Sequence, residues 1–263
     1  MQVHARMFGI VLGALAVAAC GGRDGDGDGG GGGAAGIGGS AGNGGTGGGE
    51  TSTVTGTVYS WEQTEGIRVG GVTVGVYGEP ISTTTDANGG FTLLNVPNGE
   101  VFFTTMADGY WGLVDYWVVP GESGGSVGLN VVPDAEITRW EGILRRSISA
   151  SDGAVDILYY DGAEGGETGA IDPPAGDDPF TFDLWTPMDQ TTIIVDRWTC
   201  DGSVCTFGEL FFPSVNPANG SITASVRGAP GVTYCEVDES SGKTYPIMPK
   251  MITIVYAWCE PAQ

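Results

Sequence analysis

Apolar residues alternate with polar ones in short runs from Thr53 onward, and this period of two constrains the fold more than any other feature of the sequence. Residues 72–76 read Val-Thr-Val-Gly-Val, and residues 155–159 read Val-Asp-Ile-Leu-Tyr. Successive side chains of a β-strand point to opposite faces, so this spacing predicts strands with one apolar face. Clusters of Gly, Asn, Asp and Pro separate the runs and favour tight turns. We therefore expect an all-β protein built of two β-sandwiches. Further runs lie at residues 91–93, 101–103, 127–131, 222–226 and 252–256, and residues 191–195 are another strand candidate.

Strand and turn residues in the first half of this pattern follow a recognisable order. They are Gly56-Thr57-Val58, Gly71-Val72-Thr73-Val74, Thr85-Asp86-Ala87-Asn88-Gly89-Gly90-Phe91, Val96-Pro97-Asn98-Gly99 and Gly109-Tyr110. Together they resemble the carboxypeptidase regulatory-like domain, a transthyretin-like and immunoglobulin-like β-sandwich. Gly90 departs from that family, in which a larger or polar residue is common. The resemblance implies a structural and interaction module over residues 51–133 without catalytic residues of its own. It also implies a relation to starch-binding-like sandwiches, which brings in carbohydrate by analogy alone.

Residues 134–149 change to a helical spacing, with apolar side chains at positions i, i+3, i+7 and i+11. Asp134 is expected as the N-cap of this linking helix, because its carboxylate can accept a backbone N–H of the first turn. The alternative for this segment is another strand with a loop. Alternation then resumes, so residues 150–263 predict a second, more degenerate sandwich. The apolar stripe of the helix consists of Ile137, Trp140, Leu144 and Ile148.

Residues 1–19 have the layout of a secretory signal peptide, with an uncharged and mostly apolar run that is too short to span a bilayer. The run ends in Val17-Ala18-Ala19-Cys20, which resembles the bacterial lipobox and implies that Cys20 becomes a lipidated N-terminus. The glycine-rich composition of residues 20–50 predicts a disordered tether. We therefore expect an exported protein, lipid-anchored in the bacterial cell envelope, at the outer membrane. The alternative is an ordinary signal peptide with Cys20 left as a thiol.

The 263 residues include 32 Asp plus Glu against 10 Lys plus Arg, which gives a net charge of −22. This balance excludes a nucleic-acid-binding protein, because such a surface needs clustered Lys and Arg. The single histidine, His4, lies in the expected leader. Catalysis by Ser-His-Asp or Cys-His and metal sites with histidine ligands are therefore excluded. We expect no cofactor and no enzyme. The alternative enzyme class is a histidine-free glycoside hydrolase, which would require two buried carboxylates in one cleft.

Four cysteines remain beyond the leader, and in an exported chain an even number predicts disulfides. Cys200 and Cys205 bracket four residues of an expected hairpin loop, which would place their thiols opposite each other. Cys235 and Cys259 remain as the second pair. The alternative is a zinc site formed by all four thiolates, although their spacing matches no paired C-x2-C arrangement. The acidic loop with Asp172, Asp177 and Asp178 is a weak calcium candidate, and a solvated loop is its alternative.

Aromatic residues are frequent in the first predicted sandwich, and glycan binding requires some of them to present an open ring face. The candidate ligand-binding residues are Trp61, Trp111, Tyr116 and Trp117, and the alternative for each is packing in the core. The sequence therefore predicts a non-catalytic, lipid-anchored protein whose β-sandwiches serve binding or structural work at the cell envelope. A carbohydrate-binding module is the alternative. The expected partners are the membrane, through the anchor, and glycans or envelope proteins.

Overall fold

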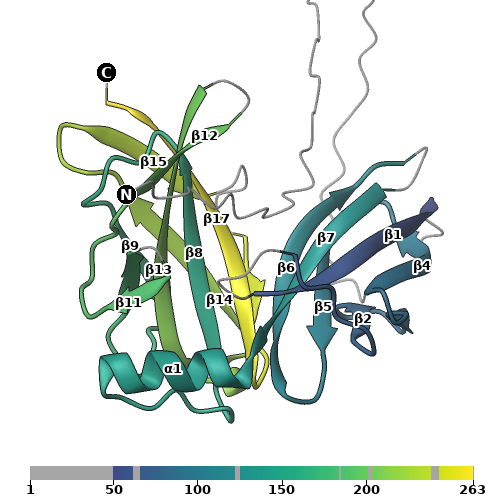
Figure 1. The fold of residues 1–263 in the computed structure, drawn as a ribbon. Helices are drawn as coiled ribbons and strands as arrows, with labels where there is room; N and C mark the ends of the chain where they lie inside the picture. Colours follow the sequence, from purple (N-terminus) through teal and green to yellow (C-terminus); the bar gives the residue numbers. More distant parts are fainter. Residues whose placement is uncertain are drawn as a thin grey trace, which may run out of the picture.

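The computed structural model describes residues 50–61, 66–121, 125–183, 185–200, 203–237 and 243–262 (Figure 1). The predicted leader, the tether and Cys20 lie outside these residues. Within the described parts, strands predominate and a single α-helix is present, so the prediction of an all-β protein is confirmed. No helix among the described residues is long and apolar enough to cross a membrane.

The N-terminal part, residues 50–133, arranges its strands in two layers around one core. β1 pairs with β4 and β7, whereas β2 pairs with β3 and β5, and β5 pairs with β6. The alternating valines predicted from the sequence fill the space between the layers, and Val58, Val74 and Leu129 are nearly inaccessible to solvent. The strands are β1 (Thr51–Ser60), β2 (Thr73–Val76), β3 (Ser82–Thr84), β4 (Gly90–Pro97), β5 (Gly99–Met106), β6 (Tyr110–Val119) and β7 (Gly125–Pro133).

The Thr-Asp-x-x-Gly-x-Phe element forms the turn before β4. The buried Thr85 hydroxyl donates to the Val69 carbonyl and accepts the Val72 N–H, each at 2.9 Å. Asp86 Oδ1 accepts two further backbone N–H groups, from Asn88 at 2.7 Å and Gly90 at 2.9 Å. Both side chains therefore satisfy backbone donors that the tight turn leaves without strand partners.

The C-terminal part packs a small sheet and a helix against opposite faces of a larger sheet. The larger sheet has the order β11-β10-β13-β8-β17, and β16-β14-β9 forms the small sheet. Val155, Ile157 and Tyr159 of β8 face the small sheet, whereas Leu158 faces the helix side. The elements are α1 (Asp134–Leu144), β8 (Gly153–Asp161), β9 (Thr168–Asp172), β10 (Phe180–Asp183), β11 (Thr186–Met188), β12 (Asp196–Cys200), β13 (Ser203–Val215), η1 (Pro217–Asn219), β14 (Ser221–Arg227), β15 (Thr233–Val237), β16 (Tyr245–Pro246) and β17 (Met251–Pro261).

Strand β17 joins the two parts of the chain, as its yellow arrow between β8 and β6 shows in Figure 1. It runs parallel to β8 from the pair Ile252–Ala154 onward, and its first residues run parallel to Gly112–Val114 of β6. A Cβ atom at Gly112 of β6 would overlap the Thr105 carbonyl oxygen of β5, so the close approach of these two strands requires glycine. The two parts therefore share one continuous sheet, in addition to the covalent link through α1.

Three local predictions need correction. The helix ends at Leu144, where Arg145 adopts the left-handed conformation, and Ile148 is buried beyond its end. Asp134 is the first helical residue, and its side chain does not cap the helix. Its Oδ2 atom instead accepts a hydrogen bond from the Lys250 ammonium at 3.0 Å. Residues 191–195 form no strand, because their main chain bonds to the loop before β9, as in Ile193 N–H to the Glu167 carbonyl.

Candidate functional site

A row of aromatic rings lies across β13, β8 and β17 near one end of the large sheet. Tyr160 in β8 is paired with Phe207 in β13 on one side and with Trp258 in β17 on the other. The Tyr160 ring centroid lies 5.2 Å from that of Phe207 and 5.5 Å from that of Trp258. Residues paired across strands share a face, so all three rings project from one side of the sheet. Tyr160 and Phe207 are buried, whereas Trp258 is 43% exposed.

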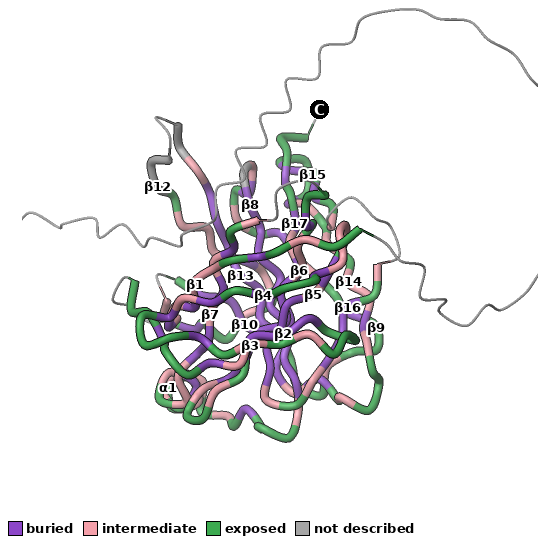
Figure 2. Tube along the Cα trace, turned by 90° about the vertical axis from the view of Figure 1, so that its right-hand side faces the viewer, coloured by how far each residue is buried: buried purple, intermediate pink, exposed green. Residues whose placement is uncertain are grey.

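Strand β15 extends this row toward solvent. Glu236 is paired with Trp258, and Tyr234 is paired with Glu260. Exposed and buried positions alternate along β15 (Figure 2), so these four side chains share the outer face and the residues between them point inward. Tyr234 is 61% exposed. We call Tyr234, Glu236, Trp258 and Glu260 the aromatic–acidic face.

A disulfide lies directly beneath this face. Cys235 and Cys259 are paired residues of β15 and β17, their Cα atoms are 4.1 Å apart, and both side chains are buried. The predicted bond between them is confirmed, and it excludes the alternative of a zinc site with all four thiolates. The bond fixes the register of the two strands, so it also holds the two exposed rings at a fixed separation.

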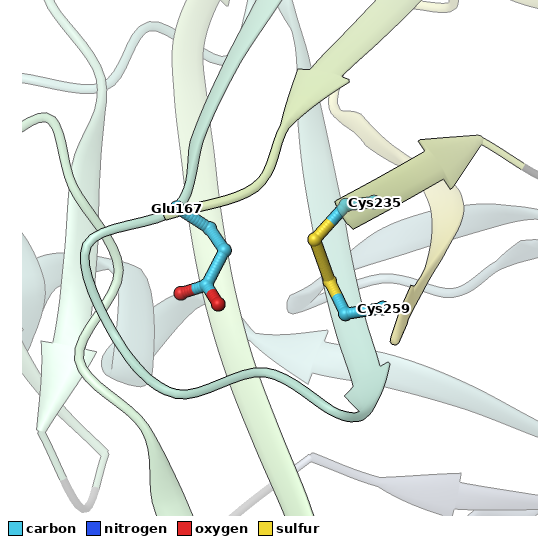
Figure 3. A group of neighbouring side chains, drawn as sticks. All are labelled: Glu167, Cys235 and Cys259. Carbon is cyan, nitrogen blue, oxygen red and sulfur yellow. A yellow bond between two sulfur atoms is a disulfide. The ribbon is translucent and has the colours of Figure 1, made fainter. Parts of the chain in front are cut away.

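Glu167 approaches the two sulfurs, as Figure 3 shows, and is the third member of a group whose potential ligand atoms lie within 4.8 Å of one another. The two cysteines offer no thiolate, because they are bonded to each other. The Glu167 carboxylate is also held by the protein: it accepts hydrogen bonds from the N–H groups of Glu164 and Gly165 and from the Thr233 hydroxyl. This group therefore has a structural role and is not a metal centre.

The second predicted disulfide pair, Cys200 and Cys205, is described by the structure only in part. The hairpin register pairs Cys200 with Ser203 and Cys205 with Trp198, so the two cysteines are diagonal neighbours and do not lie opposite each other as predicted. The turn is shorter than the expected four-residue loop. Cys205 takes part in a disulfide, but the side chain of Cys200 lies outside the described residues, so their pairing stays a prediction.

Three buried carboxylates lie below the aromatic row on the helix-facing side of the sheet. Asp115 in β6 accepts hydrogen bonds from the Tyr256 hydroxyl at 2.8 Å and from Trp117 Nε1 at 3.0 Å. Burial outweighs these bonds and raises the pKa of Asp115 from 3.8 to about 6. Asp156 in β8 and Glu209 in β13 are diagonal neighbours on the same face. Burial raises the pKa of Asp156 to about 7, and burial together with the Asp156 charge raises that of Glu209.

A small hollow lies beside Glu209. Asp196, Phe182, Trp185 and Phe207 are among the residues that line it, and its volume is about 10 Å³. A space of this size holds about one water molecule, so no sugar ring enters it. Glu209 Oε1 and Asp156 Oδ1 have no hydrogen-bond partner among the described residues. The buried carboxylates that a histidine-free glycoside hydrolase would need are therefore present, but this hollow does not give a sugar access to them.

The predicted aromatic candidates occupy less accessible positions than the prediction required. Trp111 is 2% exposed in the core beneath α1, so the prediction is wrong for this residue, because stacking needs an open ring face. Trp61 is half-buried, with its centroid 6.0 Å from that of Trp185 in an edge-on contact. Trp117 is half-buried and bonded to Asp115. The half-buried Tyr116 carries the Lys243 ammonium 3.2 Å from its ring centroid, which occupies one ring face.

The weak calcium candidates lie in an exposed loop. Asp177 accepts a hydrogen bond from the Ser214 hydroxyl at 2.6 Å, and the Asp178 carbonyl accepts one from Arg146 at 2.7 Å. In the described part of the chain, Asp172, Asp177 and Asp178 do not form a group with ligand atoms within 4.8 Å of one another. The loop is thus held by neighbouring side chains, as a solvated loop would be.

Sequence reasoning missed the exposed rings of β15 and β17, although the sequence contains a signal for them. Residues 234–236 read Tyr-Cys-Glu and residues 258–260 read Trp-Cys-Glu. If the two cysteines are paired and buried, strand alternation places the flanking aromatic and acidic residues on the opposite, outer face. The repeated aromatic-Cys-Glu triplet could therefore have predicted the aromatic–acidic face.

Comparisons with known proteins add little. No family model matches the sequence, and no curated protein does so either. Among solved structures, the Bacillus anthracis TIE protein is 14% identical over 80% of this chain, with a TM-score of 0.24, and this chain spans 34% of its length. A proposed carbohydrate-binding protein from Bacteroides uniformis is 11% identical over 76% of this chain and 98% of its own, with a TM-score of 0.23. Scores this low bear on neither the fold nor the function of this chain.

Proposed function

We propose that this chain is a non-catalytic exported protein that binds glycans on the aromatic–acidic face of β15 and β17. The observation that carries the proposal is the outward orientation of Tyr234 and Trp258, which are 61% and 43% exposed on strands joined by the Cys235–Cys259 disulfide. Exposed apolar side chains that gather on one face, with polar residues around them, are typical of binding sites, and a sugar ring can stack its apolar face on an aromatic one. The flanking carboxylates supply acceptors for sugar hydroxyls.

Preorganisation supports a binding role for this face. The rings stand on paired strands, and buried Tyr160 packs against Trp258 from the neighbouring strand at 5.5 Å. Few side-chain and main-chain motions are then lost when a ligand stacks, which lowers the entropic cost of binding. The disulfide also supports export, because such bonds persist in oxidising compartments.

The remaining predictions complete this proposal. Residues 51–133 serve as a carboxypeptidase regulatory-like spacer, and the packing of Thr85 and Asp86 in the turn before β4 supports the resemblance. Lipidation of Cys20 holds the protein at the cell envelope. Incorporation of labelled fatty acid by the wild-type chain and its loss in Cys20→Ser test the anchor, and an unlabelled wild-type chain contradicts it.

Glycan binding is tested with the full-length Cys20→Ser protein on a glycan array, followed by calorimetry with the best oligosaccharide. Trp258→Ala and Tyr234→Ala should each weaken binding by about tenfold or more, because each removes a stacking surface. Tyr234 is largely exposed, so Tyr234→Ala should change the unfolding temperature little, whereas Trp258→Ala also loses the contact with Tyr160 and is measured at a temperature at which the variant is folded. Tyr77→Ala is the matched control, since Tyr77 is 44% exposed but lies beyond β2 in the other part of the chain. Binding that is absent from the array, or unchanged in Trp258→Ala, would overturn the proposal.

A further inference from the structure

The aromatic–acidic face alternates rings with carboxylates in both directions. Along each strand an aromatic residue is followed two positions later by a glutamate, and across the strands each ring is paired with a glutamate. Directly paired side chains have Cβ atoms about 4.5–5.5 Å apart. A sugar stacked on Trp258 or Tyr234 therefore has a carboxylate at its rim.

The charge of the two glutamates is not neutralised by any residue that the structure describes. Glu236 and Glu260 are exposed, and neither forms an ion pair with a described residue. Within the face, the Tyr234 hydroxyl donates a hydrogen bond to Glu236 Oε2 at 3.4 Å. The chain as a whole has a net charge of −22, so the surrounding potential reinforces that of the two carboxylates.

Sugar chemistry decides which ligand suits this arrangement. A pyranose ring that stacks by its apolar face leaves its equatorial substituents at the rim, where the glutamates stand. A protonated amine in such a position gains a charge-assisted hydrogen bond to a carboxylate. A uronic acid would instead bring a third carboxylate against two others, which is unfavourable.

We propose that the aromatic–acidic face selects glycans with free amino groups over N-acetylated, neutral and acidic glycans. This inference rests on the proposed glycan-binding function and adds the chemical class of the ligand. The rings supply affinity for a pyranose of any kind, and Glu236 and Glu260 supply the preference for a cation.

The test compares four tetrasaccharides by calorimetry at low salt and pH 6 with the full-length Cys20→Ser protein: β-1,4-linked glucosamine, N-acetylglucosamine and glucose, and an oligogalacturonate. The glucosamine ligand should bind about tenfold or more tightly than its N-acetylated counterpart, and the oligogalacturonate least tightly. This advantage should shrink as salt screens the charges and as the pH rises past the pKa of the amine. The double variant Glu236→Gln/Glu260→Gln should lose the preference for the glucosamine ligand, because each glutamine keeps a hydrogen-bond acceptor and removes the charge.

A cationic ligand is also attracted without specificity to a protein of this charge, and the variants separate this effect. The double variant changes the net charge by two out of −22, so non-specific attraction survives it. Glu79→Gln, at an exposed position between β2 and β3, is the matched control and should keep the preference. A preference that persists in the double variant, or that Glu79→Gln also removes, overturns the inference.

The inference and the proposed function fail in different ways. Equal binding of amino and N-acetylated ligands, with loss of both in Trp258→Ala, would overturn the amino-sugar preference and leave glycan binding standing. Binding of no glycan, or binding that does not depend on Trp258, would overturn both.

Discussion

At the scale of single residues, the unusual feature of this protein is the number of carboxylates it buries on one side of one sheet. Asp115, Asp156 and Glu209 are each at most 5% exposed, and in each case burial favours the protonated form. Their partners differ, because Asp115 receives two side-chain hydrogen bonds, whereas Asp156 Oδ1 and Glu209 Oε1 receive none from the described residues. Ionisation of Asp156 and Glu209 is therefore more costly than ionisation of Asp115, because fewer hydrogen bonds offset the burial of the charge.

These groups make stability depend on pH in a defined direction. A carboxyl whose pKa is raised on folding binds its proton more tightly in the native state than in the unfolded state. The stability that it contributes is therefore complete below its unfolded pKa. This stability is lost as the pH rises through its folded pKa. This loss extends from about pH 4 to about pH 6 for Asp115, and from about pH 4 to about pH 7 for Asp156. We expect a higher unfolding temperature at pH 5 than at pH 8.

Asp156→Asn isolates this effect, because it preserves the shape of the side chain and removes its ionisation. The variant should raise the unfolding temperature at pH 8 by several degrees and change it little at pH 5. Asp172→Asn, in the exposed acidic loop, is the control and should leave the pH dependence intact. Scanning calorimetry across this pH range is the measurement. A parallel pH dependence in wild type and Asp156→Asn would show that Asp156 does not titrate in this window.

At the scale of elements, the hairpin-like pair of β15 and β17 connects stability with binding. Its buried side is joined by the disulfide and packs in the core between the two sheets, and its outer side carries the aromatic–acidic face. The disulfide closes a loop of moderate length, because the two cysteines are 24 residues apart in the sequence. Such a crosslink restricts the unfolded chain, and the loop-entropy model assigns it about 3.5 kcal/mol.

Cys235→Ala/Cys259→Ala should therefore lower the unfolding free energy by about 3 kcal/mol, as measured by denaturant titration. The same variant should weaken glycan binding even where the protein is folded, because the separation of Tyr234 and Trp258 is no longer fixed. Reduction of the wild-type protein should reproduce both effects. If the variant binds glycans with unchanged affinity, the disulfide has no part in organising the face.

Helix α1 offers a second test at this scale. Gly142 lies inside the helix, its φ is not positive, and a Cβ atom there would contact nothing within 4 Å. Gly142→Ala should thus stabilise the protein by about 0.5–1 kcal/mol, because alanine loses less backbone entropy in a helix. Denaturant titration measures it. A destabilised variant would mean that this turn of the helix is not formed as described.

At the scale of the whole molecule, the shared sheet matters more than the helix that links the two parts. β17 pairs with β6 as well as β8, and the Asp115–Tyr256 bond and the packing of Lys243 on Tyr116 also cross between the parts. Strand pairing and buried contacts of this kind couple the unfolding of one part to that of the other. The two parts should then unfold as one cooperative unit.

Calorimetry should accordingly show a single transition whose calorimetric and van't Hoff enthalpies agree. Gly56→Ala disturbs β1 in the N-terminal part, because a Cβ atom there would overlap the Phe91 ring and the Val127 carbonyl oxygen. It should shift the whole transition to lower temperature. Two resolved transitions, of which Gly56→Ala moves only one, would contradict the coupling.

The sequence by itself determined the class of the fold and much of its core. Alternation predicted strands wherever one face is buried, as in residues 72–76 and 155–159, because a period of two needs no knowledge of what covers the strand. The even number of cysteines predicted the Cys235–Cys259 bond as the pair that remains once Cys200 and Cys205 are assigned to each other. Local spacing also indicated a helix from residue 134, although the end of the helix at Leu144 depends on a left-handed Arg145 that no spacing encodes.

Only the tertiary structure decided which rings reach solvent and which strands become neighbours. Trp111 and Trp258 are both aromatic residues in strands, yet one is covered by α1 and the other lies on an uncovered face, because exposure depends on distant elements. The parallel pairing of β17 with β6 joins residues about 140 positions apart, as the bond from Tyr256 to Asp115 illustrates with a separation of 141. Alternation reports that a strand has an apolar face. It does not report the partner that covers that face, because the partner is chosen by packing over the whole chain.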